Sequence, residues 1–332
     1  MKIFTILLLI LSFVNKSIAG SVNGSPSSVL TFDGMGSRSL ALNESVVAIG
    51  SGSEAISANP ALISKIDKLN LSVMYLSWFE SMSYIYFAGA MPVPGKSFKG
   101  VVGLSIASFN SGNFDKFSEG SSSPENTSAN DYSIALGYAR GIDDKSAIGV
   151  NLKFAQSTLD KYSANAILLD LGGTYSLAES LNFPILLAFA VQNIGTSFKF
   201  DSENSPAPMN IKVGIGYNKL FAKSHNLTAD IEGNFPNDSG TIARIGIEYS
   251  FISKVYGLKL FSLRVGLQPI GRANNLFTLG VGSELPLSQY VKDYQFNIDY
   301  ALVPAGELGL THSVTVSMIF KEDVEKLFGL SE

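Results

Sequence analysis

The chain has 332 residues, of which only 16% are charged, and it carries 31 glycines, 22 phenylalanines, 13 tyrosines and a formal net charge of −4. A soluble domain has about a quarter of its residues charged, and nucleic-acid binding needs a basic stripe that this chain does not offer, so we expect no nucleic-acid partner. The chain contains no cysteine, which excludes a disulfide framework, a lipid-modified N-terminal cysteine and Cys-based metal or nucleophile sites.

The first 19 residues have the pattern of a Sec signal peptide. Met1-Lys2 gives a short basic region, an apolar stretch covers 3–14, and Ser17-Ile18-Ala19 places small residues at the cleavage positions. We therefore predict cleavage after Ala19; the alternative is an uncleaved anchor. No later window of about 18 apolar residues follows, so a membrane-bound mature chain cannot be helical.

Residues 20–67 form an N-terminal extension that differs from the rest of the chain. Residues 20–33 are rich in Ser and Gly, and residues 34–67 contain small residues and two short apolar stretches. We predict short helices near 53–58 and 60–65, interrupted at Asn59-Pro60 because proline restricts the residue before it. The segment is too small to hold its own core, so it must pack on or inside something else.

From residue 69 to residue 320, apolar and polar residues alternate with a period of two. In the last run, His312, Val314, Val316, Met318 and Phe320 share one face, and the intervening Ser and Thr residues share the other. This alternation indicates strands with one apolar face. Fourteen such runs are present, near 69–78, 82–92, 100–109, 130–140, 146–156, 166–177, 184–192, 210–218, 225–233, 241–250, 260–268, 276–284, 293–302 and 311–320.

The length and number of these runs favour a transmembrane β-barrel over 68–320. Most runs have about nine to eleven residues, which is the length of a tilted strand that crosses a bilayer, and the even number is typical of bacterial barrels. A long polar loop is expected at 109–130 and a short turn at 140–145. We therefore predict an all-β fold, a 14-stranded antiparallel outer-membrane β-barrel with its apolar face toward lipid.

Charges and aromatic residues support the barrel. Charged residues lie in mid-strand on the polar face, which would line the lumen, and aromatic residues recur at strand ends, as at a membrane interface. The charges are Lys153, Lys212, Asp230, Glu232, Arg244, Glu248, Arg264 and Asp299; the aromatics include Tyr75, Trp78, Tyr138, Tyr217, Tyr249, Tyr300 and Phe320. The alternative is a secreted sandwich or propeller, that is, a soluble periplasmic β-protein.

No motif of the chain predicts catalysis, a metal or a cofactor. The only histidines, His225 and His312, are far apart, which makes a zinc site improbable. Adjacent residues of a strand face opposite ways, so His312 and Ser313 cannot form a catalytic dyad directly. The Gly34-Met35-Gly36 stretch has no strand before it and no third glycine, as a dinucleotide loop would require. We therefore expect a protein that is not an enzyme.

Several motifs recur together along the chain. They are Gly34, Gly36, Arg38 and Asn59-Pro60-Ala61, then 191–195 (VQNIG), 263–266 (LRVG), and Asp299-Tyr300-Ala301 followed by 308–313 (LGLTHS). With these motifs the chain resembles the PorV/PorQ family, which includes an uncharacterised group of spirochaete proteins and is related to FadL-type long-chain fatty acid transporters. The resemblance covers nearly all of residues 30–320.

The resemblance implies a FadL-like barrel with a hatch formed by residues 34–67 in its lumen, and a turn at Asn59-Pro60-Ala61 near the wall. It further implies a channel for uptake of a hydrophobic, fatty-acid-like molecule, with outer-membrane lipid around it. The alternative function is that of a secretion or surface-assembly partner, in which loops and the 321–332 tail contact secretion-system proteins. The tail follows Phe320, departs from the usual aromatic end of a barrel, and looks like a short amphipathic helix.

The candidate site residues fall into two groups. Gly34, Gly36, Arg38, Asn59, Pro60 and Ala61 would form the hatch motif. Lys153, Arg244 and Arg264 are lumen cations that could meet a ligand carboxylate or pair with the lumen acids Asp230, Glu232 and Glu248; pairing is the stronger expectation.

Overall fold

The computed structural model describes residues 27, 30, 34–94, 99–117, 123–181, 183–201, 203–270, 277–287 and 293–327. The predicted signal peptide with its cleavage site after Ala19, and the end of the C-terminal tail, lie outside these residues. Within the described ranges, no helix is long and apolar enough to cross a membrane.

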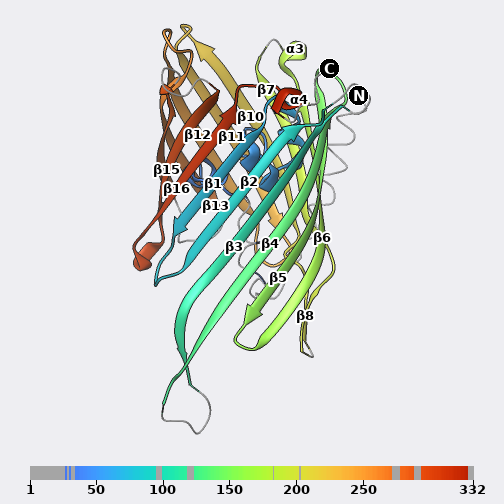
Figure 1. The fold of residues 1–332 in the computed structure, drawn as a ribbon, viewed down its shortest axis with the longest axis vertical. Helices are drawn as coiled ribbons and strands as arrows, with labels where there is room; N and C mark the ends of the chain where they lie inside the picture. Colours follow the sequence, from blue (N-terminus) through green and yellow to red (C-terminus); the bar gives the residue numbers. More distant parts are fainter. Residues whose placement is uncertain are drawn as a thin grey trace.

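Fourteen strands of the described chain close into an antiparallel barrel (Figure 1), in which each strand pairs with its neighbour in sequence and β1 pairs with β16. A two-stranded sheet, β8–β9, lies in the connection between β7 and β10. The barrel strands are β1 (Asn70–Ser77), β2 (Ser83–Pro92), β3 (Val101–Lys116), β4 (Glu125–Gly141), β5 (Ser146–Leu159), β6 (Tyr162–Ser176), β7 (Ile185–Gly195), β10 (Asn210–Phe221), β11 (His225–Pro236), β12 (Ile242–Ile252), β13 (Lys259–Ile270), β14 (Phe277–Leu285), β15 (Tyr294–Pro304) and β16 (Leu310–Phe320).

Each of the fourteen predicted runs is a barrel strand, so the predicted fold class is confirmed. The predicted 109–130 loop is wrong in part, because β3 and β4 continue pairing beyond a bulge, from Asn113↔Ser128 to Lys116↔Glu125. Strands β8 (Phe198–Phe200) and β9 (Glu203–Ser205) were not predicted. Three residues are too few to show a period of two.

Short helices complete the structure. They are α2 (Ser37–Ala41), η2 (Ser53–Ser57), η3 (Pro60–Lys65), α3 (Ala178–Leu181), η5 (Gly306–Leu308) and α4 (Val324–Leu327). The two helices predicted near 53–58 and 60–65 exist, but both are 3₁₀ helices, and α2 was not predicted. Helix α4 lies at the end of the barrel opposite the projecting β3–β4 hairpin (Figure 1). We call these the tail end and the hairpin end.

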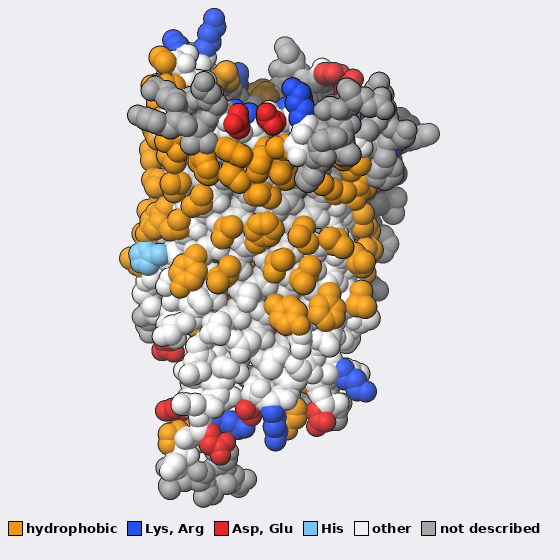
Figure 2. All heavy atoms as spheres, in the orientation of Figure 1, with side chains coloured by type: hydrophobic (Ala, Val, Ile, Leu, Met, Phe, Trp, Pro, Cys, Tyr) orange, Lys and Arg blue, Asp and Glu red, His pale blue; other side chains and the backbone are white. Residues whose placement is uncertain are grey.

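The outer surface of the barrel is apolar and the inner face of most strands is polar. In β16, Thr311, Ser313 and Thr315 are buried, whereas Val314 and Val316 are 42% and 44% exposed. Figure 2 shows the outward apolar side chains as a band, with charged side chains gathered toward the two ends of the barrel. A closed barrel with this arrangement is not a sandwich, so the predicted alternative of stacked sheets is wrong.

Residues 34–67, which we call the lumen segment, lie inside the barrel. Inward-facing side chains bind the segment: Thr315 accepts a hydrogen bond from the Ser37 amide at 2.8 Å, and Thr278 donates to the Ala41 carbonyl oxygen at 2.9 Å. Helix η3 packs against β4, β5 and β6 on another side of the barrel. The segment therefore crosses the lumen and contacts its wall in several directions.

Glycines on the inner face of the wall make room for the lumen segment. A Cβ atom on Gly149 would lie 2.4 Å from the Ala61 nitrogen, and one on Gly266 would lie 2.2 Å from the Asn43 nitrogen. Distances this short are incompatible with van der Waals contact. The glycines whose Cβ would meet the segment are Gly103, Gly137, Gly149, Gly172, Gly214, Gly216, Gly246, Gly266 and Gly280.

Candidate functional site

The Asn59-Pro60-Ala61 turn starts helix η3 and lies against β5 and β6. The Asn59 Oδ1 atom accepts a hydrogen bond from the Ala61 amide at 3.0 Å, and its Nδ2 donates to the Val47 carbonyl oxygen at 3.0 Å. Proline suits the first helical position because no amide hydrogen is needed there. The side chain of Asn59 is fully buried, so this turn both caps the helix and ties two parts of the lumen segment together.

The two glycines of the N-terminal motif occupy crowded positions. Gly36 precedes α2 with a φ of 106°, a conformation that side chains rarely adopt. A Cβ on Gly36 would lie 2.1 Å from the Glu54 Oε2 atom, and one on Gly34 would lie 2.6 Å from the Ser39 Oγ atom. Gly36 therefore allows the start of α2 to lie against Glu54 of η2, and Gly34 allows the preceding backbone to lie against Ser39 of α2.

Arg38 joins the lumen segment to the wall through a bidentate ion pair. Its Nε donates to the Glu248 Oε2 atom at 2.7 Å and its Nη2 to the Oε1 atom at 3.2 Å, while Nη1 donates to the Ile49 carbonyl oxygen at 3.1 Å. Glu248 is 1% exposed. Two parallel bonds to one carboxylate fix orientation as well as charge.

Arg264 extends this ion pair into a network on β12, β13 and β15. Its Nε lies 2.6 Å from the Glu248 Oε2 atom and its Nη1 lies 2.5 Å from the Asp299 Oδ1 atom. Glu248 and Arg264 stand directly opposite each other in the β12–β13 ladder. The expected pairing of Arg264 with a lumen acid is therefore present, and Arg38 joins the same carboxylate.

Glu54 of η2 lies next to this network. Burial raises the pKa of Glu54 to about 8, and the nearby Asp299 carboxylate adds to the increase, whereas Arg38 and Arg264 oppose it. A buried carboxyl group favours its neutral form because the surroundings solvate the charge poorly. Burial therefore favours the protonated form of Glu54, which lies beside Arg38, Arg264 and Asp299.

The remaining candidate charges have partners that the sequence did not indicate. Lys153 pairs with Asp170 at 2.7 Å and Arg244 with Glu44 at 3.7 Å; neither acid was a candidate, so the expected pairing differs for these two cations. Glu232 accepts the Val46 and Val47 amides at 3.0 and 2.9 Å.

Asp230 is fully buried on the same face of β11 as Glu232, next to residues 45–47 of the lumen segment. Its backbone carbonyl oxygen accepts a hydrogen bond from the Ser45 hydroxyl at 3.3 Å. Both acids of β11 therefore contact the backbone or side chains of the lumen segment.

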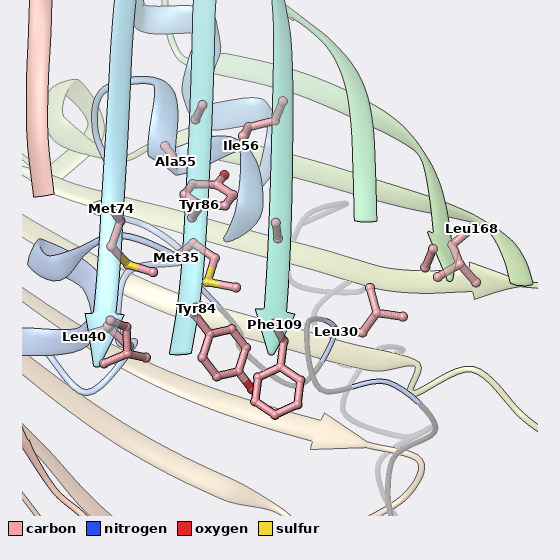
Figure 3. Close-up of a cluster of buried hydrophobic side chains, with 14 of the residues drawn as sticks. Leu30, Met35, Leu40, Ala55, Ile56, Met74, Tyr84, Tyr86, Phe109 and Leu168 are labelled. Carbon is pink, nitrogen blue, oxygen red and sulfur yellow. The ribbon is translucent and has the colours of Figure 1, made fainter. Parts of the chain in front are cut away.

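An apolar wall lines the lumen on the side of β1 to β6, and the sequence analysis missed it. Its inward side chains pack with Met35, Leu40 and Ile56 of the lumen segment (Figure 3). The Tyr84 ring lies 5.3 Å from that of Trp78 and 4.7 Å from that of Phe109, centroid to centroid. The larger wall residues are Met74, Leu76, Tyr84, Tyr86, Phe109 and Leu168, and Phe198 of β8 belongs to the same cluster.

The apolar wall has a signal in the sequence. Residues 73–76 (VMYL) and 84–87 (YIYF) are apolar without interruption, which is typical of strands that are covered on both faces. The outward members of these runs include Val73, Tyr75 and Ile85, which are 51%, 52% and 53% exposed. The alternation of apolar and polar residues predicts one apolar face for each strand. It therefore did not predict the second, inward apolar face of β1 and β2.

The tail end of the lumen holds a polar cavity of about 320 Å³. It lies between the lumen segment and the ends of β1 and β13 to β16. Charged side chains line it, including Arg38, Glu54, Lys259, Arg264 and Asp299. The lumen is therefore two-sided, with an apolar wall toward the hairpin end and a polar cavity at the tail end.

Both histidines form hydrogen bonds with tyrosines. The Nδ1 atoms of His225 and His312 lie 2.6 Å from the hydroxyl oxygens of Tyr249 and Tyr300. Ser313, the neighbour of His312, is fully buried and hydrogen-bonded to Ser37. His312 and Ser313 therefore face opposite ways, as the alternation predicts. Among the described residues, no three acids or histidines form a group that could hold a metal ion.

Comparisons with known proteins find solved barrels of the same fold. No protein-family model and no curated protein matches the chain, so membership of the PorV/PorQ family stays a prediction. The Ralstonia pickettii toluene transporter TbuX is 13% identical, with a TM-score of 0.59 over 88% of this chain and 99% of its own.

Two further structures have similar statistics. The Pseudomonas putida toluene transporter TodX is 12% identical, with a TM-score of 0.58 over 87% of this chain and 98% of its own. A Pseudomonas aeruginosa FadL homologue is 8% identical, with a TM-score of 0.53 over 86% and 98%. At these identities the likeness shows the fold, the closed fourteen-stranded barrel of FadL-like channels.

Proposed function

We propose that the chain is an outer-membrane channel through which hydrophobic small molecules pass. One observation carries the proposal: the lumen has an apolar wall, from Trp78 and Phe109 near the hairpin end to Ile56 and Ile63 of the lumen segment. A channel for water-soluble solutes has a polar interior. Apolar side chains on the inner face of a barrel that is also apolar outside need an apolar cover, which the lumen segment supplies at Met35, Leu40 and Ile56; a hydrophobic ligand could replace part of this cover.

The outer surface supports a membrane location. Leu136, Leu152 and Ile167 are 61%, 56% and 58% exposed in the middle of their strands, and an exposed apolar belt of this kind is stable when lipid surrounds it. The barrel has no open edge among its paired strands, as lipid requires. The likeness to outer-membrane hydrocarbon channels and the predicted signal peptide favour the bacterial outer membrane.

The lumen segment has the position of a hatch. Arg38 fastens it to β12 and the Asn59 turn fastens it to β6, and it fills the space between the apolar wall and the polar cavity. A molecule that moves along the apolar wall meets the segment at Met35 and Ile56. We propose that the segment blocks free diffusion of water-soluble solutes, and that a ligand moves along the apolar wall by displacing the side chains of the segment that cover it.

The single tryptophan of the chain provides a direct test, because Trp78 contacts Tyr84 and Phe109 at the apolar wall. The barrel would be placed in lipid nanodiscs and titrated with 1-bromodecane, whose bromine quenches tryptophan fluorescence on contact. We expect saturable quenching of Trp78. Quenching that rises linearly with the bromodecane content of the lipid would contradict the proposal.

A matched control separates the lumen from the bilayer. In a Trp78→Phe, Leu152→Trp variant, the tryptophan stands on the outer surface, where Leu152 is 56% exposed. A probe that merely dissolves in lipid quenches this position linearly, whereas a lumen ligand saturates only at Trp78. Substituting Tyr84 and Phe109 by Ser should weaken the saturable component while leaving the linear component unchanged.

A second role, as a surface-assembly partner, is favoured by the β3–β4 hairpin. The hairpin projects beyond the other strands (Figure 1), and its Phe114 and Phe117 are 42% and 69% exposed. Exposed aromatic side chains are common at protein interfaces. Cross-linking in cells, with the hairpin shortened from Asn113 to Ser128 as the control, would test this role; the same products with and without the hairpin would contradict it.

A further inference from the structure

Lys153 is a cation set into the apolar wall of the lumen. It faces inward from β5, and its cross-strand neighbours are Ala135 of β4 and Leu168 of β6. Leu168 and Ala155, the next inward residue of β5, are 1% and 0% exposed and belong to the apolar cluster. A ligand that lies along this wall therefore passes a lysine.

Asp170 compensates the charge of this lysine. Its Oδ1 atom lies 2.7 Å from the Lys153 Nζ atom and accepts the Asn193 amide at 2.8 Å, and its Oδ2 atom accepts a hydrogen bond from Asn151 at 3.2 Å. Lys153 also donates to the Asn193 Oδ1 atom. Asp170 is 1% exposed, so its carboxylate is committed to this network.

Asn193 stands in a bulge that allows this arrangement. The β6–β7 register shifts between Leu169 and Leu171, and Asn193 has a φ of 60°. Its Nδ2 donates to the Pro208 carbonyl oxygen at 2.8 Å. The backbone is thus held in an uncommon conformation that directs the Asn193 amide toward Asp170 and its side-chain oxygen toward Lys153.

We propose that Asp170 determines the charge specificity of the channel, so that the wall accepts uncharged hydrophobic molecules in preference to carboxylates. The inference rests on the proposed function and names its substrate class. A ligand carboxylate near Lys153 would also stand near the buried Asp170 carboxylate, and like charges repel strongly where water is scarce. An ester or a hydrocarbon of the same length meets no such penalty.

The test compares 11-bromoundecanoate with its methyl ester, by quenching of Trp78 in nanodiscs. The measured quantity is the ratio of carboxylate affinity to ester affinity, because a ratio taken across variants cancels differences in lipid partition. We expect the ratio to rise about tenfold or more, which is at least about 1.4 kcal/mol, in Asp170→Asn. That variant keeps an oxygen for Asn193 and frees the Lys153 charge.

Two further variants make the result decisive. In the double variant Lys153→Gln, Asp170→Asn, the ratio should return toward the wild-type value, because the freed cation is gone. In Lys153→Gln alone, the ratio should fall below the wild-type value, because Asp170 is left uncompensated. An unchanged ratio in both single variants, or a rise in Asp170→Asn that persists in the double variant, overturns the inference.

The proposed function fails in a different way. If neither probe quenches Trp78 saturably in the wild-type chain, the barrel is not a channel for hydrophobic molecules and the inference falls with that function. If the ester binds and the wild-type chain binds the carboxylate equally well, only the inference is overturned.

Discussion

The backbone of Gly149 and the Pro60–Ala61 peptide are packed so closely that a Cβ atom on Gly149 would lie 2.4 Å from the Pro60 carbonyl carbon. The two sites belong to different parts of the fold, the wall strand β5 and the lumen segment. Any residue larger than glycine at position 149 would clash with the Pro60–Ala61 peptide. The lumen segment and the barrel wall therefore fit closely at this point.

This contact predicts that Gly149→Ala destabilises the packed lumen segment. The added methyl group forces Pro60 and Ala61 away from the wall, and overpacking of this kind costs about 1–3 kcal/mol. We expect a lower midpoint of thermal unfolding in detergent and faster protease cleavage within 34–67. Gly233→Ala is a suitable control, because a Cβ there would have its nearest contact at 3.5 Å; equal effects of both substitutions would contradict the prediction.

The ion pair between Arg38 and Glu248 predicts that Arg38→Ala destabilises the packed lumen segment more than Gly149→Ala does. Arg38→Ala leaves Glu248 with Arg264 alone, and removing one partner of a buried ion pair costs about 3–5 kcal/mol. We expect the lumen segment to detach, which planar-bilayer conductance would report as a rise in single-channel current. Lys145→Ala removes an ion pair with Glu179 that is exposed to solvent, and it should change neither stability nor conductance measurably.

Local alternation in the sequence was sufficient to predict the wall of the barrel. In β16, the Ser and Thr face and the Val face are both visible in the sequence, and the structure places them inward and outward as expected. Each strand is recognisable by itself, because the period of two depends on residues that are near in sequence.

The interior of the barrel depends on contacts that are remote in sequence. The partner of Arg38 is 210 residues away, and nothing in the sequence distinguishes Glu248 from the other acids of the polar face. Gly149 and Gly266 look like ordinary strand glycines until the lumen segment is placed against them. The pairing of Lys153 depends on a bulge at Asn193, whose effect on register appears only when β6 and β7 are aligned.

The apolar outer belt predicts that a charged side chain on the outer face destabilises the inserted barrel most near the middle of the bilayer. Leu152→Arg places a cation in the middle of β5 on the outer face, which costs about 2–4 kcal/mol near the bilayer midplane. We expect reduced insertion into lipid vesicles, measured by the heat-resistant migration of folded barrel on gels. Thr158→Arg, at the hairpin end of the same face, should insert normally; a barrel that tolerates both substitutions equally would not be embedded in lipid at this belt.

Glu54 predicts a dependence of stability on pH. Its ordinary pKa is 4.5 and its pKa in the packed lumen segment is about 8, so between these values the packed state holds a proton that the unfolded chain has released. Stability therefore falls as pH rises from about 4.5 to 8, because the unfolded state binds fewer protons than the packed state. Above about pH 8, Glu54 is ionised in both states, and its contribution stops changing.

The measurement is the midpoint of thermal unfolding of wild type and of Glu54→Gln between pH 4 and pH 9. The glutamine is neutral at every pH, so the variant should match the wild type in acid and exceed it increasingly toward pH 8. Asp299, Arg38 and Arg264 also face this carboxyl group, but they remain in the variant, and the difference between the two curves isolates Glu54. Parallel curves over the whole range would show that Glu54 ionises at its ordinary pKa and that its burial in the lumen does not control its charge.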